Sequence, residues 1–230
     1  VLITTKGGKK GEKAKIEYEG YHGWQNPWNR QDVCNADQYK QVYHMREIAN
    51  GVKEKNWVDF TGHDTNTDWQ DEIYSKNAMI TSHQLSVTGG SEKTSFLASG
   101  SYFKQNGVIG GNQGNSYYER ISSRISIDSD VKKWLKVGGN VIFSYSNSKS
   151  LGTSGSYSPR GMALQASPLW SPLATEEQSK NYPHSANKNE DGVAYNSFDG
   201  EFLGTSEIWN PMIQITEPIQ LFKQDYLNGT

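Results

Sequence analysis

The chain has 230 residues, with 23 lysines and arginines against 25 aspartates and glutamates, so its formal net charge is −2. This balance argues against a nucleic-acid-binding protein, which normally carries a basic surface. Only 34% of the residues are hydrophobic, yet the chain holds 13 tyrosines, 7 tryptophans and 23 glycines. Few aliphatic side chains beside many aromatic residues and glycines favour a β-rich protein over a helical one.

No apolar run approaches the roughly 20 residues of a membrane-spanning helix, whereas the strands of a membrane barrel show only alternation. Residues 1–5 (Val-Leu-Ile-Thr-Thr) already form a β-branched run, so we expect the chain to begin inside an element of a larger protein. Cys34 is the only cysteine and therefore cannot form a disulfide within the chain.

Apolar and polar residues alternate along several segments, which predicts strands with two different faces. The predicted strands cover residues 15–24, 85–88, 96–103, 121–128 and 135–146, and a further strand starts near 220–226. Polar, hairpin-sized turns are expected at 89–93 and 129–133, whereas the connections at about 25–82, 106–116 and 149–211 are longer. Short turns at one end and long loops at the other are typical of an outer-membrane barrel.

One helix is predicted within the first long connection, over residues 35–51. Asn35 is a suitable N-cap and Gln38 stands three residues later, as in a capping box. Gly51 can end the helix. The apolar stripe of this helix consists of Tyr39, Val42, Tyr43 and Ala49.

The polar motifs do not assemble into a catalytic or metal site. Asp64, Asn66 and Asp68 resemble the start of a calcium loop, but Trp69 replaces its obligatory glycine and Ser75 its last acidic ligand. A hydrogen-bonded Asx turn is the favoured interpretation, and a looser calcium site is the alternative. The five histidines form no i,i+4 pair, so zinc is not expected. We therefore expect no catalytic residue, no metal and no cofactor.

The aromatic residues carry more information than the polar motifs. Trp24, Trp134 and Tyr145 lie on or next to predicted strands and fit the aromatic belts at membrane interfaces. Five further tryptophans fall in the expected long loops, and four of them are the candidates for contact with a ligand or a partner: Trp57, Trp69, Trp170 and Trp209. These four can pack within the loops, stack on a ligand or contact a partner protein, and the sequence leaves the three roles open.

The order of several motifs resembles a known family. Residues 1–8 are similar to the last plug-domain strand of TonB-dependent receptors. The later segments are similar, in order, to the early barrel region of the SusC/RagA-type receptors: 67–73, 85–94, 102–107, 120–127 and 134–139. The resemblance covers nearly the whole chain, and the joint order is more specific than any single motif.

The resemblance implies a division into residues 1–8, the C-terminal strand of a plug, and residues 9–230, the N-terminal part of a barrel. The expected fold class is mainly β: an antiparallel transmembrane barrel fragment of about six strands, with long outer loops and one short loop helix. Such receptors lie in the outer membrane of Gram-negative bacteria and import nutrients, usually glycan oligosaccharides and sometimes peptides. They are not enzymes.

The resemblance also implies partners. These are a SusD-like lipoprotein lid, TonB acting through a region outside this chain, an oligosaccharide or peptide ligand, and outer-membrane lipid. The rival class is a secreted β-sandwich that binds carbohydrate through its tryptophans. A β-rich glycan hydrolase is a third class, but it requires two convergent carboxylates that the sequence does not offer.

Overall fold

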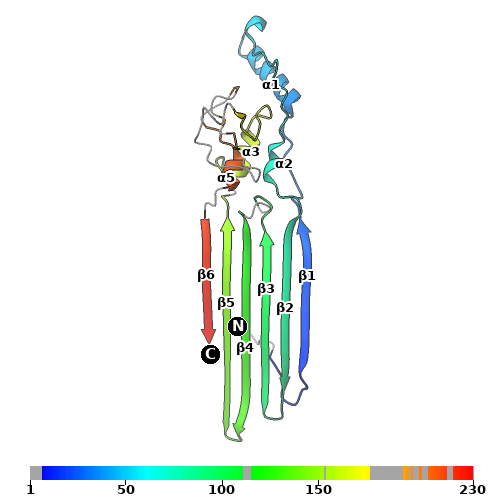
Figure 1. The fold of residues 1–230 in the computed structure, drawn as a ribbon, viewed down its shortest axis with the longest axis vertical. Coiled ribbons are helices and arrows are strands. Elements are labelled where there is room, and N and C mark those ends of the chain that lie inside the picture. Colours follow the sequence, from blue (N-terminus) through cyan, green and yellow to red (C-terminus); the bar gives the residue numbers. More distant parts are fainter. Residues whose placement is uncertain are drawn as a thin grey trace.

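The structure, a computed structural model, describes residues 7–110, 115–152, 154–176, 194–196, 198, 202–203, 207–216 and 220–229. Its main element is a six-stranded antiparallel sheet in which the strands lie in chain order (Figure 1). The strands are β1 (Lys15–Gln25), β2 (Ala78–Gly90), β3 (Thr94–Asn106), β4 (Tyr117–Lys132), β5 (Leu135–Ser150) and β6 (Gln220–Gly229). The mainly β, antiparallel prediction is thus confirmed. The plug strand expected at 1–8 lies outside the described residues, apart from Gly7 and Gly8.

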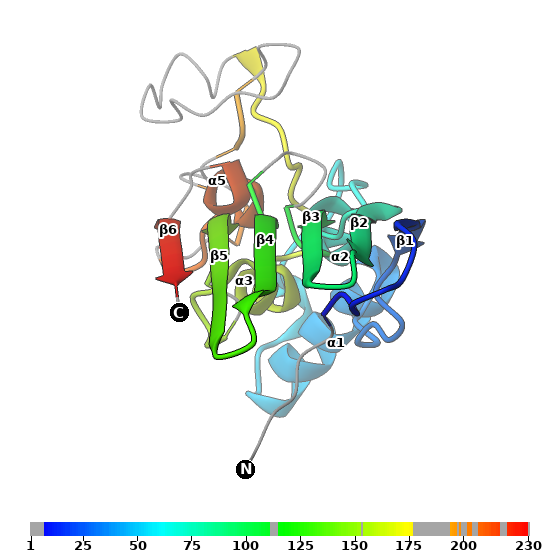
Figure 2. The same ribbon diagram turned by 90° about the horizontal axis from the view of Figure 1, so that it is seen from below.

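The sheet is a single layer. Viewed along the strands, β1 to β6 form one row, and the helices lie beyond one end of the strands (Figures 1 and 2). Strands β4 and β5 each contain 16 residues, which corresponds to about 50 Å at 3.3 Å per residue. Among the described residues, no element covers either face of these long strands. This is unusual for a water-soluble domain, where strands average about six residues and one face is buried.

The connections differ sharply between the two ends of the sheet. At one end, three residues (91–93) join β2 to β3, and only Lys133 and Trp134 join β4 to β5. At the other end, the connections span residues 26–77, 107–116 and 151–219. The turn predicted at 129–133 was placed too early, because the pairing continues through a register shift between Asp130 and Lys132.

The predicted helix forms as α1 (Ala36–Ala49). Asn35 Oδ1 accepts a hydrogen bond from the Gln38 backbone N–H, and Gln38 Oε1 accepts one from the Asn35 N–H, so the capping box is confirmed. Gly51 follows the helix with a φ of +73°, a conformation that glycine adopts without strain.

The predicted apolar stripe of α1 is divided between two environments. Tyr39 and Tyr43 pack against a small cluster around Phe60, whereas Val42 is 54% exposed. Ala49, the last member of the stripe, is exposed as well. The reason is that α1 projects from the rest of the chain, so only one side of it meets other residues (Figure 1).

The expectation of a single loop helix was incomplete. The long connections also contain α2 (Trp69–Ile73), α3 (Pro159–Gln165), α5 (Pro211–Thr216) and a 3₁₀ turn, η1 (Glu54–Asn56). Helices α2, α3 and α5 have too few residues to show a periodic pattern, and packing against one another stabilises them. No helix in the described ranges is long and apolar enough to cross a membrane.

Candidate functional site

One face of the sheet is apolar over its middle and its short-turn half. The antiparallel register places Ile16 opposite Val87, Val87 opposite Ala98, Ala98 opposite Ile125 and Ile125 opposite Val141. These five residues form one continuous row across five strands, because residues in register share a face. Their exposure is high, with Ile16 at 71%, Ile125 at 56% and Val141 at 50%. A contiguous apolar surface of this size requires an apolar environment or a partner.

The opposite face is polar. In the neighbouring register row, Glu17 lies opposite Ser86, Ser86 opposite Ser99 and Ser99 opposite Arg124. Arg124 Nε donates a 2.8 Å hydrogen bond to Asn140 Oδ1 on β5. Glu17, Ser86, Ser99 and Arg124 are among the residues that line a cavity of about 150 Å³ on this face. The two faces therefore match the lipid side and the lumen side of a membrane barrel, in which apolar and polar residues alternate along every strand.

The three predicted interface aromatics lie toward the two ends of the strands. Trp24 is 65% exposed near the long-loop end of β1, and Tyr145 lies opposite Ile121 in the long-loop half of β5. Trp134 is 77% exposed in the two-residue turn at the other end. Trp24 and Tyr145 share the apolar face with Ile16 and Val141 by strand alternation. Their contact with a membrane interface stays a prediction.

A second structural unit covers the long-loop end of the sheet. Its core contains side chains from α2, α3, α5 and the loops between them, with Ile73 and Ile215 fully buried. Trp69 and Trp170 belong to this core and are 3% and 2% exposed. Their indole N–H groups donate hydrogen bonds to backbone carbonyls, Trp69 to Ser167 and Trp170 to Phe202, both at 2.8 Å. The structure thus favours the packing role for these two residues.

The other two predicted loop tryptophans have different surroundings. Trp57 is half-buried beside the His44 ring, and its indole N–H donates to the Val52 carbonyl. Trp209 is 61% exposed. Trp28, in the first long connection, is 96% exposed. Contact of any of these rings with a ligand or a partner stays a prediction.

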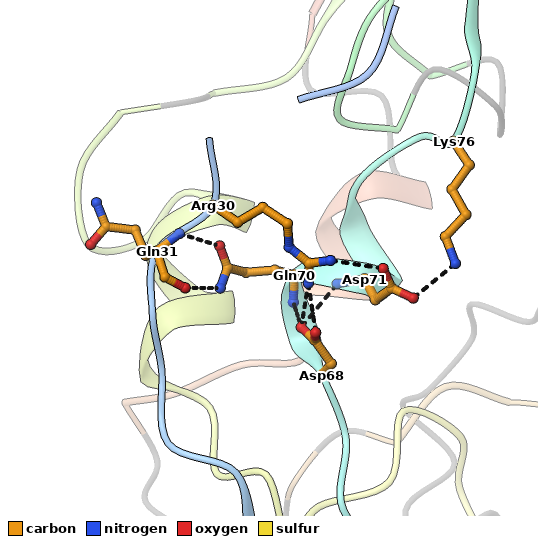
Figure 3. Close-up of polar contacts among 6 residues, drawn as sticks. All are labelled: Arg30, Gln31, Asp68, Gln70, Asp71 and Lys76. Atoms are coloured by element: carbon orange, nitrogen blue, oxygen red, sulfur yellow. Dashed lines mark hydrogen bonds and ion pairs between the residues drawn. The ribbon is translucent and has the colours of Figure 1, made fainter. Parts of the chain in front are cut away.

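A polar network attaches residues 30–31, near the start of the first long connection, to α2, near its end (Figure 3). Asp68 caps α2 by accepting from the backbone N–H groups of Gln70 and Asp71, and it also accepts from Arg30 Nη2 at 2.6 and 2.7 Å. Arg30 Nη1 donates to Asp71 at 2.9 Å. The Gln70 amide pairs with both backbone groups of Gln31, at 2.7 and 3.0 Å. This arrangement fixes residues 30–31 against the helix.

The charges in the network perturb one another. The hydrogen bond from Lys76 Nζ, at 2.8 Å, lowers the pKa of Asp71 below its usual value, and Arg30 adds to this effect. Burial raises the pKa of the neighbouring Glu72. Sequence patterns did not reveal this network, since Arg30 and Asp68 are 38 residues apart, although the N-cap position of Asp68 is a local signal.

The oxygens of the calcium-like motif serve the loop structure. Asp64 Oδ1 lies 3.4 Å from Lys40 Nζ, Asn66 Oδ1 accepts from the Ala36 backbone N–H, and Asp68 caps α2. Within the part of the chain that the structure describes, no group of three or more acidic, histidine or cysteine residues is arranged to hold a metal.

Two larger cavities lie where the loops meet the sheet. One, of about 480 Å³, is lined by strand ends, including Gln25, Gln105 and Lys149. The other, of about 520 Å³, is lined by Trp28, Arg30 and Tyr74 among others. Both have the size of small-molecule sites and combine aromatic or aliphatic walls with hydrogen-bonding groups.

Curated relatives of the chain are TonB-dependent receptors. The receptor P3 of Formosa agariphila is 35% identical over 144 residues, which cover 61% of this chain and 12% of that protein. The receptor SusC of Bacteroides thetaiotaomicron is 33% identical over 112 residues, or 47% of this chain and 10% of that protein. Over these segments the chain is similar to TonB-dependent receptors, SusC among them. The chain spans about an eighth of the length of these relatives, and no protein-family model matches it.

Solved structures show the same fold. The RagAB peptide importer in its open-open state matches 98% of this chain and 26% of its own, with a TM-score of 0.62 and 20% identity. Its closed-closed state matches 66% of this chain with a TM-score of 0.55 and 22% identity. Together with the curated relatives, these structures confirm the resemblance to SusC/RagA-type receptors that the order of the motifs indicates. The names of the curated relatives describe receptors, which agrees with the expectation that the chain is not an enzyme.

Proposed function

We propose that this chain is a section of the wall and outer loops of a TonB-dependent transporter in a bacterial outer membrane. The observation that carries the proposal is the separation of the sheet into an apolar and a polar face along strands of up to 16 residues. In lipid, backbone groups must be paired, so the edges of β1 and β6, which pair with no further strand in the described part of the chain, require the remaining strands of a closed barrel. A β-sandwich offers no reason for a single uncovered layer.

The orientation follows from the connections. In outer-membrane barrels the short turns face the periplasm and the long loops face outward. The turns at 91–93 and 133–134 then lie in the periplasm, and α1, α2, α3 and α5 lie outside the cell. On this interpretation, Gly7 and Gly8 lie on the path from the plug into β1.

The substrate class that we propose is glycan oligosaccharides, with peptides as the alternative. Flat aromatic faces exposed on the loops support this choice, because sugar rings stack on such faces. The exposed rings belong to Trp28, Tyr157 and Trp209, at 96%, 72% and 61%. The transporter uses energy that TonB transmits through the part of the protein that precedes this chain.

A SusD-like surface lipoprotein is the proposed partner on the outside. Helix α1 offers a surface for it, because Val42, Met45 and Ile48 are 54%, 66% and 57% exposed. Their spacing of three residues places them along one side of the helix. An apolar side on the element that projects farthest from the sheet suits a protein partner rather than solvent (Figure 1).

The test is a deletion of the full-length gene, followed by growth on single oligosaccharides and on peptides. Loss of growth on one oligosaccharide, restored by the wild-type gene, supports the proposal. A growth defect confined to peptides contradicts the substrate class but not transport. A deletion without any uptake defect, together with a soluble gene product, contradicts the transporter proposal itself.

A further inference from the structure

The short-turn end of the sheet carries an excess of positive charge. Segments 7–17, 91–93 and 128–138 contain five carboxylates and eight lysines. The lysines are Lys9, Lys10, Lys13, Lys15, Lys93, Lys132, Lys133 and Lys136. The first long connection, residues 26–77, has the opposite balance, with nine carboxylates and six basic residues. The two ends of this part of the wall therefore carry net charges of opposite sign. Repulsion among the lysines destabilises the basic end unless anions lie against it.

Four of the lysines surround one cavity. It has a volume of about 290 Å³ and is lined by Lys93, Asp130, Val131, Lys132, Lys133 and Lys136. Asp130 is its one carboxylate, and this group already lies 2.5 Å from Lys10 Nζ and 3.9 Å from Lys136 Nζ. Within the described residues, Lys93, Lys132 and Lys133 form no salt bridge with a carboxylate. The cavity thus retains net positive charge toward solvent.

Apolar side chains accompany the lysines at the same hairpin. Trp134 is 77% exposed, and Val131 and Val137 are each 53% exposed. The Lys132 ammonium lies 5.6 Å from the centre of the Trp134 ring, within cation–π range. The register pairs Asp130 with Lys136 in the polar row, whereas Lys132 pairs with Leu135 in the apolar row. Lys132 and Lys133, at the tip of the hairpin beside the exposed indole, therefore match a molecule with an anionic group attached to an apolar body.

We propose that Lys132 and Lys133, at the tip of the β4–β5 hairpin, bind the phosphate group of an anionic phospholipid in the inner leaflet of the outer membrane. The lysines contact the phosphate, and Trp134 lies at the level of the glycerol and upper acyl chains, where its ring is favourably placed. A free phosphate ion accounts for the lysines but leaves the exposed Trp134 and valines without a function. The inference rests on the proposed membrane location and on its orientation.

The test uses the complete receptor in detergent and measures its affinity for phosphatidylglycerol by native mass spectrometry. Phosphatidylcholine with the same acyl chains serves as the neutral probe, and inorganic phosphate as a competitor. The variant is Lys132→Gln with Lys133→Gln. The matched control is Lys53→Gln with Lys55→Gln, which removes two exposed lysines from the first long connection. Heat-modified mobility on gels verifies that each variant is folded.

Each lysine near a membrane surface contributes about a fivefold factor in binding to anionic lipid. We therefore expect the turn variant to bind phosphatidylglycerol about 25-fold more weakly, with no change for phosphatidylcholine or for the loop control. An unchanged affinity in the turn variant overturns the inference, and so does full competition by inorganic phosphate. If the receptor is nevertheless found in the outer membrane, the proposed function stands. If the receptor is not found in the outer membrane, the proposed function and this inference are both contradicted.

Discussion

Ile125 offers a sharp test of which face of the sheet meets lipid. It lies between Ala98 and Val141 in the central apolar row and is 56% exposed within this chain. If lipid covers this face, a lysine at the position sits near the middle of the hydrocarbon layer. The expected loss is about 2–4 kcal/mol of unfolding free energy, the cost of a lysine at the bilayer midplane of a barrel.

The control is one residue away. Ser126 points to the polar face, so Ser126→Lys adds the same charge toward water and should change stability by at most about 0.5 kcal/mol. The assay is guanidinium unfolding of the complete receptor in lipid vesicles, followed by tryptophan fluorescence. Equal losses for Ile125→Lys and Ser126→Lys, or no loss for Ile125→Lys, would refute the assignment of the faces. A soluble β-sandwich with Ile125 on its surface predicts that second result.

The remaining predictions concern the loop unit. Trp69→Ala should lower its stability by about 3–5 kcal/mol, whereas Trp209→Ala should leave stability unchanged and weaken oligosaccharide binding, as thermal unfolding and calorimetry can show. Asp68→Ala removes the α2 cap and should raise amide exchange in residues 69–74 by about fivefold, equivalent to about 1 kcal/mol. Because the pKa of Asp71 is lowered in the folded state, its ionised carboxylate stabilises the fold. This stabilisation is complete above the unfolded pKa near 3.8 and is lost as the pH falls through the folded pKa. Pepsin should therefore cleave residues 26–77 faster at pH 2.5 than at pH 4.5, and Lys76→Gln should reduce this difference; a pH-independent rate would contradict the role of the network.

The strands were predictable because their pattern is local. Alternation at Leu135, Val137, Val141 and Phe143 marks one face without any knowledge of the neighbouring strand. The end of β4 was not predictable in the same way. Ser129 and Asp130 are common turn residues, yet pairing with β5 continues past them, because cross-strand contacts outweigh turn propensity.

The helices show the same division between local and long-range signals. The start of α1 was readable because Asn35 and Gln38 interact three residues apart. Helices α3 and α5 have local signals, Ser158-Pro159 and Asn210-Pro211, but their existence depends on packing across the long loops. The burial of Trp69 and Trp170 likewise depends on contacts about 100 residues apart, so sequence alone left their packing and binding roles open.

The central claim is that the sheet crosses the outer membrane with its long connections outside. Cys34 tests it directly, because it is exposed in the connection between β1 and β2. A membrane-impermeant maleimide is applied to intact cells that carry the complete receptor with no cysteine besides Cys34. We expect labelling of Cys34, and we expect Glu92→Cys in a Cys34→Ser background to react only after the outer membrane is permeabilised. Labelling of Glu92→Cys on intact cells, with Cys34 protected, would contradict the orientation and the account built on it.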